Sequence, residues 1–165
     1  MMSADNDFLA SQVVVRNAYK TDWDEAMKLA WDTFEEFNAP EYSELGISNF
    51  KNFVNDNMLY KMFVMGHYQM MVARKKSGEL IGMITIRDNN HISLLFVDSV
   101  YHRCGVGKAL VNFAAMYVRD EEGLDKVTVN SSPYAVDFYH RLGFKDIKGE
   151  IVQDGIRITP MELKL

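Results

Sequence analysis

The stretch Arg103-Cys104-Gly105-Val106-Gly107-Lys108 decides how this sequence is expected to fold, because it joins an extended apolar run to an amphipathic helix. The first backbone N–H groups of a helix have no partner within the helix and lie at the positive end of its dipole. The two glycines leave room for a phosphate to approach, and Arg103 and Lys108 add positive charge. The stretch therefore predicts a phosphate-binding loop, although glycines that only shape a strand-to-helix turn give the same pattern.

Two common nucleotide-binding motifs do not fit these residues. A P-loop requires glycine at the position of His102, and a dinucleotide-binding loop requires glycine or alanine at the position of Leu110. The sequence therefore supports neither ATP nor NAD as the ligand of the loop.

Apolar periodicity on either side of the loop predicts a mixed α/β fold. Apolar residues three or four positions apart indicate helices, and β-branched or alternating apolar runs indicate strands. Three successive strands before the loop, joined by short turns, are expected to pair in antiparallel fashion. The expected strands are residues 13–15, 70–73, 80–86, 91–97, 126–130, 156–158 and 161–163, and the expected helices are residues 23–34, 48–65 with an interruption near 55–57, 106–121 and 133–142.

The composition indicates one globular domain. The chain has 165 residues, of which 48% are hydrophobic and 25% are charged, so a single core is sufficient. We expect residues 1–12 to be a flexible N-terminus and residues 13–165 to form the domain. The start lacks a basic flank and a long apolar run, so we expect no signal peptide, no membrane partner and a cytoplasmic location. One cysteine, Cys104, excludes a cysteine-rich zinc cluster, and no metal is expected.

The formal net charge of −5 is unevenly distributed, because residues 22–56 contain nine acids and two lysines. A surface of this kind lacks the basic footprint that nucleic acid requires, so no nucleic-acid partner is expected. The acids are interpreted mainly as a solvated helix face, with attraction of a cationic acceptor such as a polyamine as the alternative.

The loop and a second motif together resemble the GNAT superfamily of N-acetyltransferases. The family's pyrophosphate loop reads Gln or Arg, two residues, Gly, one residue, then Gly or Ala, and residues 102–107 follow it with His102 at the first position. Downstream, Tyr139-His140-Arg141-Leu142-Gly143-Phe144 resembles the family's tyrosine, three residues, Gly-Phe signature. The resemblance spans about residues 13–165, and Ser132 stands where many relatives have asparagine.

This resemblance implies a single-domain fold with a mostly antiparallel twisted central sheet, a splayed middle strand and flanking helices. It also implies acetyl-CoA as cosubstrate and direct attack of an acceptor amine on the thioester, with backbone N–H groups near Phe96 and Val97 stabilising the oxyanion. The cofactor-binding residues that it implies are Leu95, Phe96, Val97, His102, Arg103, Cys104, Gly105, Val106, Gly107, Lys108, Asn130, Ser132 and Tyr139.

Tyr139 matches the position of the family's general acid, since a phenol can protonate the departing thiolate. Its alternative role is core packing, for which the adjacent Phe138 is the better candidate. Cys104 next to Arg103 suggests an acetyl-cysteine intermediate, but the family's geometry implies that this position faces the pyrophosphate, so we discount that route.

The base that deprotonates the amine is less well determined. His91 is a candidate, although a histidine that follows a turn is more often an exposed strand-end residue. Glu35, Glu36 and Glu41 are further candidates, although most charges in that segment are expected at the surface.

The expected partner is a small-molecule or peptide amine. Most aromatic residues of the first half are expected in the core, but those that flank Pro40 are candidates for an acceptor pocket between the first two helices. Pairing of a sheet edge near residues 156–158 would make a homodimer. A non-catalytic acyl-CoA-binding module is the alternative to an enzyme.

Overall fold

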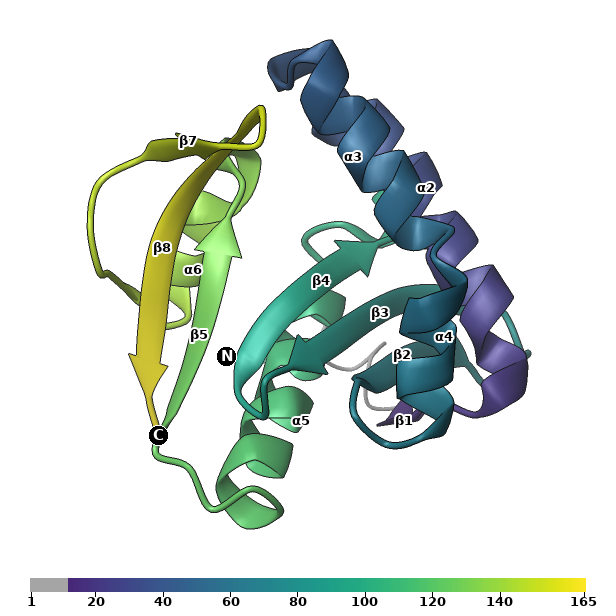
Figure 1. Ribbon diagram of the computed structural model, residues 1–165. Helices are drawn as coiled ribbons and strands as arrows, with labels where there is room; N and C mark the ends of the chain where they lie inside the picture. Colours follow the sequence, from purple (N-terminus) through teal and green to yellow (C-terminus); the bar gives the residue numbers. More distant parts are fainter. Residues whose placement is uncertain (1–11) are drawn as a thin grey trace.

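The computed structural model describes residues 12–165 of the chain, which form one mixed α/β unit (Figure 1). The expected flexible N-terminus lies outside the described residues, apart from residue 12. The strands run in the order β1-β2-β3-β4-β5-β8-β6, and β7 pairs with β8. Their bounds are β1 Val13–Asn17, β2 Gln69–Lys75, β3 Leu80–Arg87, β4 His91–Val97, β5 Lys126–Ser131, β6 Lys145–Asp146, β7 Ile151–Gln153 and β8 Ile156–Lys164.

Helices cover both faces of the sheet (Figure 1). On one face, α2 packs on the strands through a cluster that contains Trp23, Met70 and Val72. On the other, α5 packs through a cluster that contains Met71 and Leu110, so successive residues of β2 serve opposite cores. The α-helices are α2 Trp23–Phe37, α3 Glu44–Val54, α4 Asn57–Val64, α5 Val106–Asp120 and α6 Val136–Arg141, and the 3₁₀ turns are η1 Lys20–Asp22, η2 Ala39–Glu41, η3 Ser99–Tyr101 and η4 Pro133–Ala135.

The sheet divides between β4 and β5. These parallel strands pair only at His91 with Thr128 and Ile92 with Val129, and beyond this point they diverge toward their C-terminal ends (Figure 1). The splayed middle strand and the mostly antiparallel sheet are therefore confirmed. The amide of Asp98 donates to the carbonyl of Ile81 at 2.8 Å on the β3 side. In an antiparallel pair only every second residue of a strand forms hydrogen bonds with the neighbouring strand. The backbone N–H and C=O groups of Leu95 and Val97 therefore point away from β3, into the division between β4 and β5.

Two elements differ from the sequence expectation. The second helix is interrupted near residues 55–57 as expected, but it begins earlier, where Ser43 accepts a hydrogen bond from the amide of Gly46. The two expected closing strands are one strand, β8, and its residues 156–158 pair with β7. The edge that was expected to be available for a homodimer is therefore covered by β7 on that side.

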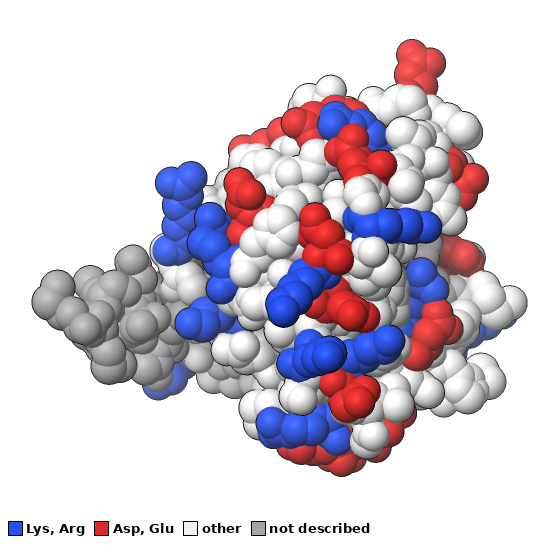
Figure 2. All heavy atoms as spheres, turned by 90° about the vertical axis from the view of Figure 1, so that its left-hand side faces the viewer, with Lys and Arg blue, Asp and Glu red and all other residues white. Residues whose placement is uncertain are grey.

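Charges of both signs alternate on the face that carries β7 and β8. Figure 2 shows acidic and basic side chains next to one another over this side of the molecule. Arg157 pairs with Glu150 at 3.1 Å, and Lys126 pairs with Glu162 at 3.7 Å. In residues 12–165, no helix combines the length and hydrophobicity needed to cross a bilayer.

Gly82 allows α5 to lie close to the sheet. A Cβ atom on Gly82 would lie 2.9 Å from Cδ1 of Leu110 and 3.1 Å from Cγ1 of Val106, both in the core. Gly82→Ala is therefore expected to lower the free energy of unfolding by about 1–3 kcal/mol through overpacking. Chemical denaturation measures the change. Gly149→Ala is the matched control, because its Cβ would contact nothing within 4 Å, and an equal loss in both variants would contradict the packing argument.

Candidate active site

A cavity of about 1070 Å³ extends from the division between β4 and β5 to the ends of α2 and α3. Ten of the side chains and backbone positions expected at the site line it, and four do not. Those in the wall are His91, Leu95, Phe96, Val97, His102, Arg103, Gly107, Asn130, Ser132 and Tyr139. Those outside it are Cys104, Gly105, Val106 and Lys108.

The loop before α5 has the backbone conformation of an anion site. Gly105 precedes the helix with φ of 85°, in the left-handed region that glycine adopts at low cost, and Arg103 has φ of 62°. No side chain of the described residues caps the helix, so the amides of residues 106–108 remain available to a ligand. The side chain of Val106 lies in the core and the whole residue is 1% exposed, so the side chain is not open to a ligand. The loop therefore fits a pyrophosphate held by amides and by Arg103.

Gly107 lines the cavity, as expected of a cofactor-binding residue, and it also has a packing role that the sequence did not indicate. A Cβ atom at this position would lie 3.1 and 3.2 Å from the Cζ and Cε2 atoms of Phe138. The missing side chain therefore makes room for an aromatic ring of the neighbouring α6, in addition to any ligand. The sequence could not reveal this contact, since the two residues are far apart in the chain.

His102 joins the loop to the end of β4. Its Nε2–H donates to the carbonyl of Val97 at 2.7 Å, and its ring centroid lies 4.8 Å from that of Phe37. A backbone carbonyl only accepts, so this bond requires the proton on Nε2. The Cys104 thiol donates to the carbonyl of His102 at 3.6 Å and does not line the cavity. His102 thus positions the loop, and the geometry gives no support to an acetyl-cysteine route.

Tyr139 combines a buried ring with a hydroxyl that reaches the cavity. The ring is 4% exposed and lies 5.2 and 5.1 Å from those of Phe138 and Phe144, centroid to centroid. The hydroxyl has no hydrogen-bond partner among the described residues. Every fully buried side-chain N or O atom of these residues does have a partner, so this hydroxyl is not fully buried. The hydroxyl must therefore touch the cavity surface. Burial raises the pKa of Tyr139, so the phenol stays protonated near neutral pH.

The relative burial of Phe138 and Tyr139 was predicted wrongly. Phe138 was the better core candidate from the sequence, but it is half-buried and lines the cavity above Gly107. The helix α6 turns Tyr139 into the core instead, because Phe144 follows on the next segment and packs against it. Helical spacing alone separates the two faces without saying which one faces inward.

His91 is half-buried in the cavity wall, so the expectation of an exposed strand-end histidine is wrong. Its Nδ1 lies 2.7 Å from the Oγ1 atom of Thr128, with which it forms the first of the two residue pairs between β4 and β5. Burial, followed by the positive charge of Arg87, lowers the pKa of His91 from 6.5 to about 4. The imidazole is therefore neutral at pH 7.

This pKa shift predicts a pH dependence of stability. Because folding lowers the pKa of His91 from 6.5 to about 4, its contribution is complete above pH 6.5 and is lost as the pH falls toward 4. We expect the free energy of unfolding to fall by on the order of 1–2 kcal/mol over this range, after allowance for partial exposure. Urea denaturation at several pH values measures it, and His91→Asn should flatten the curve.

The buried carboxyl group of Asp22 affects stability at a lower pH than His91 does, so the two contributions can be measured separately. Burial alone would raise the pKa of Asp22, but hydrogen bonds from Arg16, the Tyr19 amide and Arg74 lower it from 3.8 to about 2. Its contribution is present above pH 3.8 and is lost below that value. An unchanged pH profile in His91→Asn above pH 4 would therefore contradict the assignment to His91.

The side of the cavity next to α2 and α3 is aromatic, and it includes residues that flank Pro40, which the sequence suggested as candidates for an acceptor pocket. The rings in the wall come from α2, the following loop and α3, whereas Glu35, Glu36 and Glu41 lie outside it. The two acids that do line the cavity, Asp137 and Asp154, were not singled out from the sequence, because nothing in their local pattern distinguishes them from surface acids. The lining aromatic residues on this side are Phe34, Phe37, Tyr42, Phe50 and Phe53.

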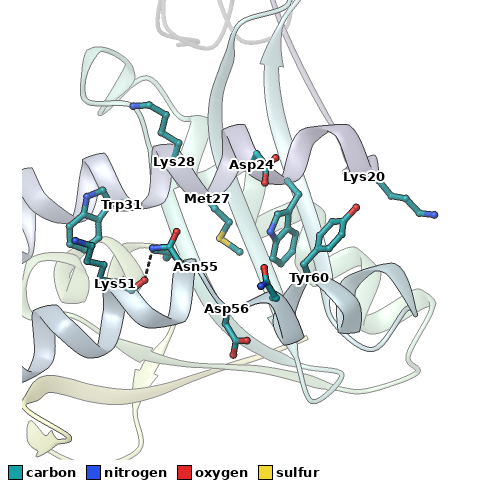
Figure 3. A pocket seen from close by; sticks show the side chains of 12 residues that line it. Lys20, Asp24, Met27, Lys28, Trp31, Lys51, Asn55, Asp56 and Tyr60 are labelled. Carbon is teal, nitrogen blue, oxygen red and sulfur yellow. Dashed lines mark hydrogen bonds between the residues drawn. The ribbon is translucent and has the colours of Figure 1, made fainter.

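A second, smaller cavity of about 630 Å³ lies between α2 and the junction of α3 with α4 (Figure 3). Met27, Trp31 and Tyr60 lie on its apolar wall, and Asn55 and Asp56 stand at the helix junction. It contains none of the expected site residues. In residues 12–165, no group of three or more potential metal ligands occurs here or elsewhere.

Solved structures share this architecture over almost the whole chain. A GCN5-related N-acetyltransferase from Rhodopseudomonas palustris has a TM-score of 0.79 at 20% identity and covers 94% of this chain and 97% of its own. The PaiA N-acetyltransferase of Thermoplasma acidophilum, in complex with coenzyme A, has a TM-score of 0.76 at 21% identity, with coverages of 93% and 99%. The spermidine N-acetyltransferase SpeG of Vibrio cholerae has a TM-score of 0.66 at 17% identity, with coverages of 93% and 94%. At these identities the likeness concerns the fold.

Curated relatives match over shorter stretches. The UPF0157 protein YqkA of Bacillus subtilis is 27% identical over 103 residues, and mycothiol acetyltransferase of Salinispora tropica is 43% identical over 56 residues. The matches cover 61% and 32% of this chain but only 30% and 18% of those proteins. The family model of the acetyltransferase (GNAT) domain matches residues 38–165, which include the loop, the divided sheet and Tyr139. The chain therefore belongs to the GNAT acetyltransferase family.

Proposed function

We propose that the chain is an acetyl-CoA-dependent N-acetyltransferase that acetylates a primary amine. The observation that carries the proposal is the continuity of one cavity, which extends past the loop before α5, the open edge of β4 and Tyr139. A ligand held at the loop by its pyrophosphate can therefore extend toward the tyrosine. Membership of the GNAT family supports the same activity.

Three groups of residues would hold the cosubstrate. The amides of residues 106–108 and Arg103 would bind the pyrophosphate. The backbone groups of Leu95 and Val97 that point into the division would pair with the pantetheine amides, as an added strand would. Asn130 and Ser132 stand across the division, at the end of β5. Bound here, acetyl-CoA supplies the thioester acetyl group.

Tyr139 is the proposed general acid. As the amide C–N bond forms and the thioester C–S bond breaks, the amine nitrogen releases one proton to solvent and the sulfur gains one from the phenol. Solvent then returns a proton to the phenolate, so the protons balance over one turnover. The raised pKa of Tyr139 keeps that proton available. Backbone N–H near Phe96 and Val97 is the proposed donor to the oxyanion.

The proposed role of His91 is to accept a hydrogen bond in its neutral form. A base works best with a pKa near the working pH, and burial lowers the pKa of His91 to about 4. We therefore assign the conversion of the incoming ammonium to the neutral amine, before attack, mainly to its desolvation in the cavity, since burial disfavours an ammonium. His91 would then orient the neutral amine.

Binding and turnover test the proposal separately. Saturating acetyl-CoA should raise the melting temperature, because a ligand of the native state stabilises it, and thiol release with a panel of amines should report transfer. Stabilisation without thiol release from any amine would favour the non-catalytic acyl-CoA-binding module, and absence of stabilisation would contradict both.

A further inference from the structure

The walls of the cavity indicate what kind of amine the site accepts. Resting on the proposed function, we infer that the acceptor is a small primary amine attached to an aromatic or similarly flat apolar body, and not a polyamine. Three observations on the described residues carry this inference: the ring surface on the acceptor side, the charges of the lining and the closed end of the cavity.

Aromatic rings form a continuous surface from the loop after α2 to the central strand. The ring centroids of Tyr42 and Phe34 are 5.2 Å apart, those of Phe34 and Phe50 are 4.0 Å apart, and those of Phe50 and Phe96 are 5.8 Å apart. All four residues line the cavity; Phe34 is buried and the other three are half-buried. Rings prefer offset or edge-to-face neighbours, so this surface suits a flat apolar group.

The charges in the cavity wall do not suit a polycation. Asp137 and Asp154 are its only acids among the described residues, and both are exposed, while Arg87, Arg103 and Arg141 also line it. None of the nine acids of residues 22–56 is in the wall. The attraction of a cationic acceptor, left open from the sequence, therefore has no counterpart in this cavity. A second or third ammonium group would lose hydration in a wall that carries three arginines, and the only carboxylates that it could meet there among the described residues are the two exposed ones.

The end of the cavity beside α3 is closed by a direct contact. The Ser43 hydroxyl donates to the carbonyl of Gly155 at 3.0 Å, and the Asn49 side chain donates to the carbonyl of Asp154 at 3.2 Å. A Cβ atom on Gly46 would lie 2.6 Å from the oxygen of Gly155, so the helix and the β7–β8 turn touch closely. A peptide chain cannot run through this end without breaking these bonds, which favours a small acceptor.

An amine panel at saturating acetyl-CoA tests the inference by thiol release. We expect kcat/KM for 2-phenylethylamine to exceed that for spermidine and for a lysine-containing peptide by at least about tenfold. Equal or better use of spermidine or the peptide would overturn the inference and leave the proposed function intact. If no amine releases thiol, the proposed function fails, and the thermal shift of the acetyl-CoA complex by 2-phenylethylamine against spermidine still decides which class the cavity binds.

A ring-specific variant sharpens the test. Phe50→Leu keeps an apolar side chain and removes the ring, so we expect KM for 2-phenylethylamine to rise about five- to tenfold, with KM for butylamine within about twofold of wild type. The matched control is Phe63→Leu, whose ring stacks on Trp23 at 5.0 Å outside the cavity and should leave both KM values unchanged. Equal KM increases for both amines in Phe50→Leu would contradict recognition of the aromatic body.

Discussion

Replacing Tyr139 with phenylalanine is expected to lower kcat about 100-fold, because a positioned general acid contributes on this order to the rate. The melting temperature should stay the same, since the ring keeps its contacts with Phe138 and Phe144 and the hydroxyl has no partner among the described residues. KM for acetyl-CoA should change by less than about twofold, because the lost interaction belongs to the transition state. Steady-state thiol release measures all three parameters alongside a thermal melt.

Tyr60→Phe is the control for Tyr139→Phe. This tyrosine also packs in an aromatic cluster, with its ring 5.5 Å from that of Trp23, but it does not line the active-site cavity. Removal of the Tyr60 hydroxyl in Tyr60→Phe should leave kcat unchanged. Wild-type kcat in Tyr139→Phe would remove Tyr139 from the mechanism, and a fall in melting temperature would instead show a structural role for its hydroxyl.

Gly105→Ala is expected to weaken acetyl-CoA binding by at least about tenfold, because the amides of α5 would no longer point at the pyrophosphate. Gly105 has φ of 85°, and an alanine there costs about 1–2 kcal/mol or forces the helix start to another conformation. Isothermal titration calorimetry with acetyl-CoA measures the affinity.

Gly123→Ala separates backbone strain from ligand binding. Gly123 follows the C-terminal end of α5 and has φ of 67°. A Cβ atom at this position would contact nothing within 4 Å. Both variants should lose similar stability, but only Gly105→Ala should lose affinity. Wild-type affinity in Gly105→Ala would mean that the loop before α5 does not hold the pyrophosphate.

The loop and the sheet were predictable because both depend on local pattern. Glycines before an apolar helical stripe indicate a helix start at Val106, and alternating runs indicate strands, so the family and the fold class are confirmed. The polar residues near Asp56 indicated the interruption between α3 and α4, and the side chain of Asp56 caps the start of α4. The start of α3 was missed, since Ser43 caps it within a segment where apolar spacing is weak.

The roles of individual site residues were less predictable. His91 was expected at the surface, but it is half-buried in the cavity wall, where burial keeps its imidazole neutral. Phe138 was expected in the core in preference to Tyr139, but Tyr139 is the buried residue of the two. Each outcome depends on segments that are distant in sequence, such as β5 beside β4 and α6 beside the start of α5. Periodicity describes one segment at a time, and it contains no information on which partner covers it.

The sequence by itself determined the succession of a strand, a glycine loop and a helix start, and it predicted an anion site of the GNAT type there, because backbone conformation and helix ends are local properties. Only the tertiary structure decided what surrounds that site. Packing turned the acids of residues 22–56 away from the cavity and turned the aromatic rings of α2 and α3 into it. Desolvation, ring contacts and the spacing of charges arise only when distant segments meet, so local sequence patterns could not predict them.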